Sequence, residues 1–178
     1  GDRHQESRAE DRQGVEKAEQ QGLVLMAKYW PEPEPGDIVD CRFPEDKVPG
    51  PGPKERPALV TNVDTFAGDA GATHVIVDVA YGTSQGTANP YPGEFVVEAR
   101  HPGTGLTRDT KFDLGKIFRL KFNDEWFAPA APPHPRVPPK RGQLDPGDQK
   151  IKKKILSALT EAKSAGRSTK AVVPRSRP

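Results

Sequence analysis

The sequence predicts a small, mainly β protein whose strands form an antiparallel, strongly bent sheet or a small barrel. Several short segments alternate apolar and polar residues, as half-buried strands do. These segments follow one another without helices between them, so the rhythm of a parallel βαβ fold is missing. A hydrophobic content of 33% and 20 prolines among 178 residues indicate one compact domain with long segments outside its core.

The expected strands begin at residues 38–43. Residues 44–55 are expected to form a surface loop, because this segment holds four prolines and two glycines in twelve residues. A glycine-rich connection at residues 65–72 separates the next two strands, and a turn at residues 123–125 returns the chain into Trp126 and Phe127. The other strands are expected at residues 58–63, 74–81, 94–99 and 115–122, with a short pairing segment at 110–112.

One amphipathic helix is expected over residues 149–165. Asp145 and Pro146 are placed as an N-cap and a first-turn proline, and Gly166 as a stop. Lysines occupy the face opposite the apolar one, so the helix should pack on its own domain or on a partner. The apolar face consists of Ile151, Ile155, Ala158, Leu159 and Ala162.

Charge divides the chain more sharply than its net +2 suggests. The N-terminal 35 residues carry a net charge of −3, the next hundred −4, and the last 43 residues +9. We therefore expect the C-terminal segment to supply charge for binding rather than to complete the fold. The predicted organisation is a polar N-terminal arm (1–34), a β domain (35–128), a proline-rich strap (129–145), and a helix with a basic tail (146–178).

Several classes of protein do not fit the composition. No apolar run approaches the ~18 residues needed to cross a bilayer, and the N-terminus lacks a signal-peptide pattern, so we expect a cytoplasmic protein without a membrane partner. Cys41 is the only cysteine and is expected to be a buried, inert thiol. The four histidines show no ligand spacing, so neither a metal nor a cofactor is expected.

Two segments indicate a phosphodiester-binding site. Residues 56–60 (Arg-Pro-Ala-Leu-Val) begin one strand, and residues 81–85 (Tyr-Gly-Thr-Ser-Gln) end the next. Arg56 can hold two phosphate oxygens with its planar guanidinium, and Thr83 and Ser84 can add neutral hydrogen bonds. Since neighbouring strands lie about 5 Å apart, we expect these side chains to converge on one concave site. The alternative is that Arg56 caps a turn and the hydroxyls only begin a loop.

With Pro-Gly-Asp-Ile-Val at 35–39 and Gly-Leu-Thr-Arg-Asp-Thr-Lys-Phe-Asp-Leu at 105–114, these segments make residues 35–128 similar to the PemK/MazF family of toxin endoribonucleases. The resemblance implies an SH3-like barrel, a homodimer, a cognate antitoxin protein as partner, and RNA as substrate. It also implies that Arg56 and Thr83 are the catalytic pair. The implied reaction is metal-independent attack by the ribose 2′-hydroxyl, which leaves a 2′,3′-cyclic phosphate and a 5′-hydroxyl.

The same resemblance points to Lys111 and Asp113 as a basic residue and a carboxylate for phosphate contact and proton transfer. Lysine binds phosphate as a point charge without the fork of arginine, and an exposed strand-end ion pair is the alternative interpretation. Lys54 and Ser84 are further substrate-binding candidates. Glu55, next to Lys54, either orients Arg56, acts as a base, or is a solvated loop charge.

Two functions remain open at this point. The first is an endoribonuclease toxin of a type II toxin–antitoxin system that cleaves single-stranded RNA. The second is a non-catalytic barrel that serves as a structural subunit of a phage particle or another large assembly, tethered through its N- and C-terminal arms. An acidic domain attracts RNA poorly, so the first function would need the basic C-terminal segment for electrostatic steering.

Overall fold

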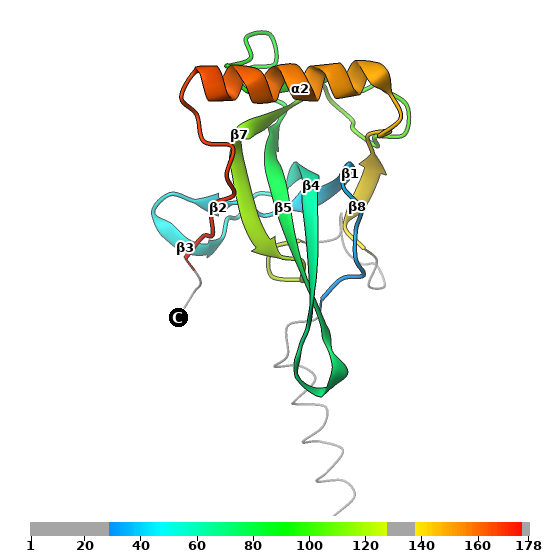
Figure 1. Cartoon of the computed structure of the whole chain (residues 1–178), viewed down its shortest axis with the longest axis vertical. Helices are drawn as coiled ribbons and strands as arrows, with labels where there is room; N and C mark the ends of the chain where they lie inside the picture. The colour runs from blue at the N-terminus through cyan, green and yellow to red at the C-terminus, as the bar shows by residue number, and fades with distance from the viewer. Residues whose placement is uncertain (1–28, 128–137, 176–178) are drawn as a thin grey trace, which may run out of the picture.

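The structure is a computed structural model that describes residues 29–127 and 138–175. Predictions for most of the N-terminal arm (1–28), for the strap at 128–137 and for the last three residues lie outside this part of the chain. A six-stranded antiparallel sheet, a two-stranded ribbon and one long helix make up the fold (Figure 1). The elements are β1 (Asp37–Cys41), β2 (Pro44–Glu45), β3 (Val48–Pro51), β4 (Arg56–Ala67), the 3-10 turn η1 (Asp69–Gly71), β5 (Thr73–Thr83), β6 (Glu94–Val97), β7 (Thr110–Lys121), β8 (Lys140–Gln143) and α2 (Gln149–Ser164).

The strands of the sheet run in the order β6-β7-β5-β4-β1-β8, and every neighbouring pair is antiparallel. The prediction of a mainly β, antiparallel fold with a C-terminal helix is thus confirmed. Within the described residues β6 and β8 are the two edges, so the hydrogen-bonded strands form an open sheet rather than a closed barrel. No helix in this part of the chain is long and apolar enough to cross a membrane.

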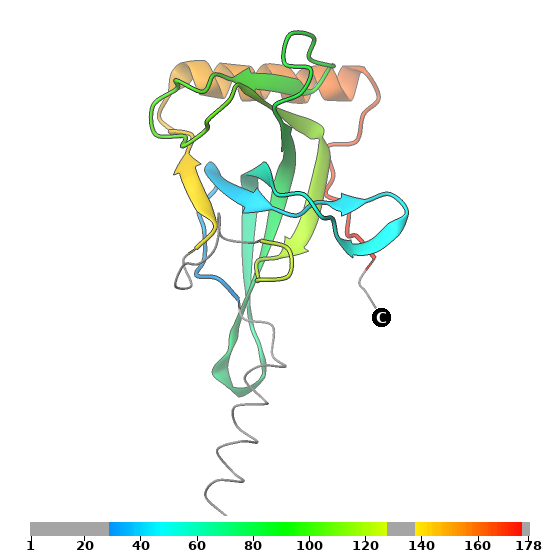
Figure 2. The same cartoon turned by 180° about the vertical axis from the view of Figure 1, so that it is seen from behind.

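The sheet has two apolar faces because successive strand residues point to opposite sides. We call one the helix face; α2 lies across it, as both views show (Figures 1 and 2). We call the other the tryptophan face, because Trp30 and Trp126 cover part of it. Adjacent residues divide between the faces, so that Ile38 joins the helix-face cluster and Val39 the tryptophan-face cluster.

The predicted loop at residues 44–55 was wrong in part, because β2 and β3 pair there as a short ribbon. Pro44 lies opposite Pro51, and Glu45 opposite Val48. Proline lacks the amide hydrogen needed within a sheet, but an isolated two-stranded ribbon requires few ladder bonds, which is why the proline-rich segment can pair. The ribbon projects from the side of the sheet, close to the C-terminal segment (Figure 2).

Two other local predictions can be compared with the structure. The turn predicted after residue 122 is present, and Trp126 and Phe127 lie buried at its end, where the Phe127 amide donates to the Asn123 carbonyl at 3.0 Å. The N-cap of α2 is Asp148 rather than Asp145, and its carboxylate accepts from the Lys150 amide at 2.9 Å. Asp145 instead closes the preceding turn by accepting from the amide of Gly147.

The C-terminal segment completes the fold, contrary to the expectation that it supplies charge alone. Strand β8, inside the predicted strap, pairs with β1, and Leu144 directly after it is 2% exposed. On α2, Ile151 and Ala158 are buried in the helix-face cluster. Farther on, the Val172 amide donates to the Ile117 carbonyl at 2.8 Å, which adds a short parallel bridge to β7.

Two ion pairs also hold strand β8 against β1. Asp40 on β1 accepts a hydrogen bond from Arg141, and Asp37 pairs with Lys140 at 3.2 Å. Asp40 is 1% exposed. Its burial raises the pKa of the carboxyl above the ordinary value of 3.8, and the hydrogen bond and charge of Arg141 offset only part of this effect.

We expect Asp40→Asn to flatten the dependence of stability on pH. Above pH 3.8 and below its raised pKa, folded Asp40 binds more protons than unfolded Asp40, so the free energy of unfolding falls as pH rises through this window. The variant lacks this titration and should gain stability relative to the parent as pH rises. Urea unfolding from about pH 4 to 7 measures the difference. A constant difference across this range would contradict the expectation.

Candidate active site

Arg56 and Thr83 lie at neighbouring strand ends on the tryptophan face. Ala58 of β4 pairs with Tyr81 of β5. Arg56 precedes Ala58 by two residues and Thr83 follows Tyr81 by two, so both lie at the same level and on the same face. Gly82 allows this approach, because a Cβ there would overlap the carbonyl oxygen of Pro57.

The next strand brings the second pair of candidates to the same face. In the register of β5 with β7, Lys111 lies opposite Thr83 and Asp113 opposite Tyr81. Glu94 on the edge strand β6 lies opposite Asp113. Polar side chains thus continue the tryptophan face beyond the end of its apolar cluster, across four adjacent strands.

Arg56 and Lys54 line a cavity of about 210 Å³ between the β2–β3 ribbon and the sheet. The Arg56 guanidinium carbon lies 5.6 Å from the centre of the Tyr81 ring. The ammonium of Lys116, which also lines the cavity, lies 4.1 Å from the same centre. The tyrosine therefore holds two cations by cation–π contact in the wall of the cavity.

Thr83 and Ser84 do not line this cavity. Thr83 is 9% exposed, and its Oγ1 accepts a hydrogen bond from the Gln85 amide at 3.2 Å. A hydroxyl that accepts one hydrogen bond keeps its own proton as a donor. Ser84 is exposed in the turn after β5. The expected convergence of all three side chains on one concave site is therefore wrong in part: the register places Thr83 beside Arg56 in the sheet, but of the three only Arg56 lines the cavity.

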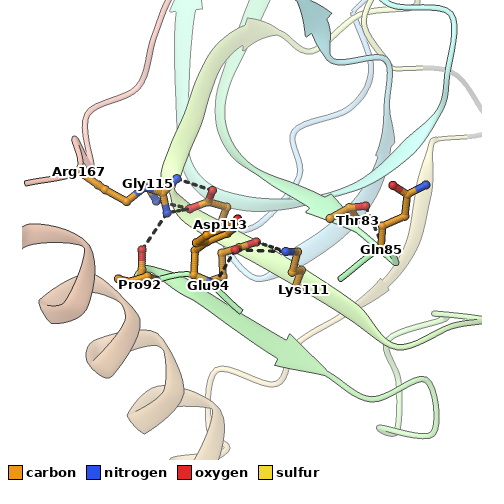
Figure 3. A network of polar contacts seen from close by, with 9 residues as sticks. Thr83, Gln85, Pro92, Glu94, Lys111, Asp113, Gly115 and Arg167 are labelled. Carbon is orange, nitrogen blue, oxygen red and sulfur yellow. Dashed lines mark hydrogen bonds and ion pairs between the residues drawn. The ribbon is translucent and has the colours of Figure 1, made fainter. Parts of the chain in front are cut away.

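Lys111 and Asp113 do not pair with each other, and neither forms the exposed ion pair that was the alternative interpretation. Lys111 is 8% exposed and its Nζ lies 2.9 Å from Oε2 of Glu94 (Figure 3). Glu94 also accepts from the Tyr91 amide at 2.8 Å. A buried ion pair of this kind is favourable when further hydrogen bonds satisfy the carboxylate, as the Tyr91 amide does here.

Asp113 is held by a residue from the C-terminal segment. Arg167 donates to Oδ1 at 2.7 Å and to Oδ2 at 2.6 Å, the bidentate geometry of a strong charge-assisted pair (Figure 3). The Gly115 amide donates to the same carboxylate at 2.8 Å. The hydrogen bond with Asp113, together with the charges of Asp113 and Glu94, raises the pKa of Arg167 despite some desolvation.

The remaining candidates have other neighbours. Glu55 lies 3.8 Å from Arg42, so it is not placed to orient Arg56. The Cys41 thiol is fully buried, and burial together with the charge of Asp40 raises its pKa, as expected of an inert thiol. Among the described residues, no three side chains of His, Cys, Asp or Glu gather in an arrangement that could hold a metal ion.

Three charged residues of the site were not predicted from the sequence. Lys116 reaches Tyr81 because Ala80 pairs with Ile117 and Tyr81 with Asp113, which leaves three extra β7 residues in a bulge. A glycine next to a lysine within a strand pattern was a usable signal for this bulge. Glu94 and Arg167 gave no such signal, because their partners are distant in the sequence.

No protein-family model matches the chain, and no curated protein matches it in sequence.

Proposed function

We propose that the protein is a metal-independent endoribonuclease that cleaves single-stranded RNA, a toxin of the PemK/MazF type. The observation that carries the proposal is the juxtaposition of Arg56 and Thr83 at one level of one sheet face, next to a concave, lysine-lined surface. The motifs that resemble the family support it independently. A homodimer with an SH3-like barrel and a cognate antitoxin protein are part of the same proposal.

The proposed reaction requires the protein to accept a proton, to donate a proton, and to stabilise charge on the phosphoryl oxygens. The ribose 2′-oxygen attacks the adjacent phosphorus, the bond from phosphorus to the 5′-oxygen breaks, and the proton lost by the 2′-hydroxyl is balanced by one gained at the 5′-oxygen. Arg56 holds the phosphoryl oxygens as charge grows on them, and Thr83 donates a hydrogen bond to the same group. Lys111 lies opposite Thr83 and forms an ion pair with Glu94. These two residues are the nearby pair that can exchange protons with the substrate.

The cavity lining offers groups that can bind RNA. Lys54, Arg56 and Lys116 offer three cations to a polyanion and Tyr81 offers an aromatic surface, while the carboxylates of Glu45 and Asp46 line the same cavity. Beyond this site the last 43 residues carry a net charge of +9, and this charge supplies the steering that the acidic domain lacks.

The proposal is tested by incubating the purified protein with single-stranded RNA in excess chelator and analysing the ends of the products. We expect cleavage, with a 2′,3′-cyclic phosphate on one fragment and a 5′-hydroxyl on the other. No cleavage of any RNA sequence, or fragments with 5′-phosphates, would reject the proposal. The first of these outcomes would favour the non-catalytic subunit.

Thr83→Val is expected to lower the cleavage rate roughly 10²-fold, because it removes one donor to the phosphoryl group while keeping shape and strand preference. Thr65→Val is the matched control, since Thr65 is exposed on β4 in the part that projects from the sheet. Single-turnover cleavage by the two variants, at equal fractions folded, makes the comparison. Equal rates for Thr83→Val and the parent would remove Thr83 from the mechanism.

A further inference from the structure

Arg167 belongs to the C-terminal segment but acts within the candidate site. It follows Gly166, which has a φ of +72° and ends the helical path after α2. Its guanidinium donates hydrogen bonds to Asp113, 54 residues earlier in the sequence, and to the Pro92 carbonyl at 2.8 Å. Figure 3 shows it between the loop before β6 and the bulge of β7.

The contact with Arg167 changes the net charge of the neighbouring side chains. Lys111, Glu94 and Asp113 lie side by side on β6 and β7 and together carry a charge of −1 when ionised. Glu94 is 9% and Asp113 8% exposed, so water can screen this charge only weakly. With Arg167 in place the group is neutral. Without it, a net negative charge would lie next to Thr83, where the proposed function requires a phosphate to bind.

The backbone leaves room for the guanidinium. At Gly115, in the β7 bulge, a Cβ would come within 2.7 Å of the Arg167 guanidinium carbon and 2.9 Å of its Nε. Real Cβ contacts are not this short, so a side chain at residue 115 would force the Arg167 guanidinium to shift from its present position against Asp113. The bulge therefore both offers its amide to Asp113 and accommodates the arginine.

We propose that Arg167 is a positioning residue of the candidate site: it fixes the Asp113 carboxylate and cancels its charge, so that the phosphate of an RNA substrate can bind beside Thr83 and Arg56. This inference rests on the proposed function for its substrate. It assigns the C-terminal segment a direct part in the site, in addition to its general positive charge.

The experiment measures binding of a 2′-O-methyl RNA oligonucleotide, which cannot be cleaved, near neutral pH. For Arg167→Ala we expect binding about tenfold weaker than the parent, because the charge of Asp113 is no longer cancelled. The charged or titratable groups around Asp113 are Arg167, Glu94 on β6, Tyr81 on β5, and Lys111 and Lys116 on β7.

Three further variants separate charge from structure. Arg167→Lys should recover part of the affinity, because one ammonium replaces the fork. Gly115→Ala keeps both charges but crowds the guanidinium where it contacts Asp113, so it should weaken binding in the same direction as Arg167→Ala. Arg167→Ala combined with Asp113→Asn should restore affinity, which a merely structural role would not produce.

The outcomes distinguish this inference from the proposed function. If the parent binds the oligonucleotide and the variants behave as described, the role of Arg167 stands even when the parent cleaves no RNA. If Arg167→Ala and Gly115→Ala both bind like the parent, the role is wrong even when the parent cleaves RNA. If the parent binds no oligonucleotide, the inference is overturned along with its substrate. If Arg167→Ala fails to fold, Gly115→Ala and the double variant decide between these results.

Discussion

Arg56→Ala is expected to lower metal-free RNA cleavage by about 10²–10³-fold, the usual effect of removing one oriented group that stabilises transition-state charge. The planar guanidinium can hold two phosphoryl oxygens at once. Its contact with Tyr81 already fixes it near the entrance of the cavity, so little ordering is needed when substrate binds. The effect should therefore appear in the rate of the chemical step.

Two comparisons sharpen this prediction. Arg56→Lys keeps the charge but loses the fork, and it should bind RNA nearly as well as the parent while cleaving more slowly. Arg100→Ala removes the same charge from an exposed site, where Arg100 pairs with Glu98 at 2.6 Å, and should cleave like the parent. Single-turnover rates with all three variants make the measurement. Parent-like cleavage by Arg56→Ala would show that the proposed chemistry is wrong.

The sequence predicted the main strands well because alternation reports burial directly. Ile38 and Val39, or Leu59 and Val60, must face opposite sides of a sheet, and each side has its own apolar cluster. The strands that were not predicted lie in segments rich in proline, which is uncommon in paired strands. Strand β8 begins directly after two prolines, and the β2–β3 ribbon pairs one proline with another. Strand β8 pairs with the distant strand β1, a contact that local patterns do not report. The ribbon is a local pairing, but its prolines depart from the usual strand composition.

The candidate site was also predicted only in part. Arg56, Thr83, Lys111 and Asp113 were named from motifs, and the sheet register brings all four to one face. The partners of the last two could not be predicted. A carboxylate two residues from a lysine suggests a mutual pair, yet residues i and i+2 on a strand are separated by about 7 Å along the chain. Each therefore pairs with a residue from another segment.

The loss of β8 and α2 should have the largest effect on stability. A chain that ends at Phe127 is expected to lose cooperative unfolding, because it removes the covering of the helix face and leaves Ile38, Leu59 and Phe112 exposed to water. It also leaves Asp40 of β1 without its partner Arg141. Urea unfolding followed by near-UV circular dichroism measures the loss. This outcome is opposite to that expected if the C-terminal segment supplied charge alone.

A chain that ends at Gly166 is the control for this truncation. It removes Arg167 and the segment that bridges to β7 but keeps β8 and α2, so it should still unfold cooperatively. A single substitution gives the same test without truncation: Ile151 is 4% exposed, and Ile151→Ala should cost about 2–5 kcal/mol. If the chain ending at Phe127 unfolds as sharply as the parent, α2 is dispensable and its burial of the helix face contributes nothing to the fold. If only that chain loses its transition, the helix is part of the domain core, and the basic character of the last 43 residues is carried by an element that the fold requires.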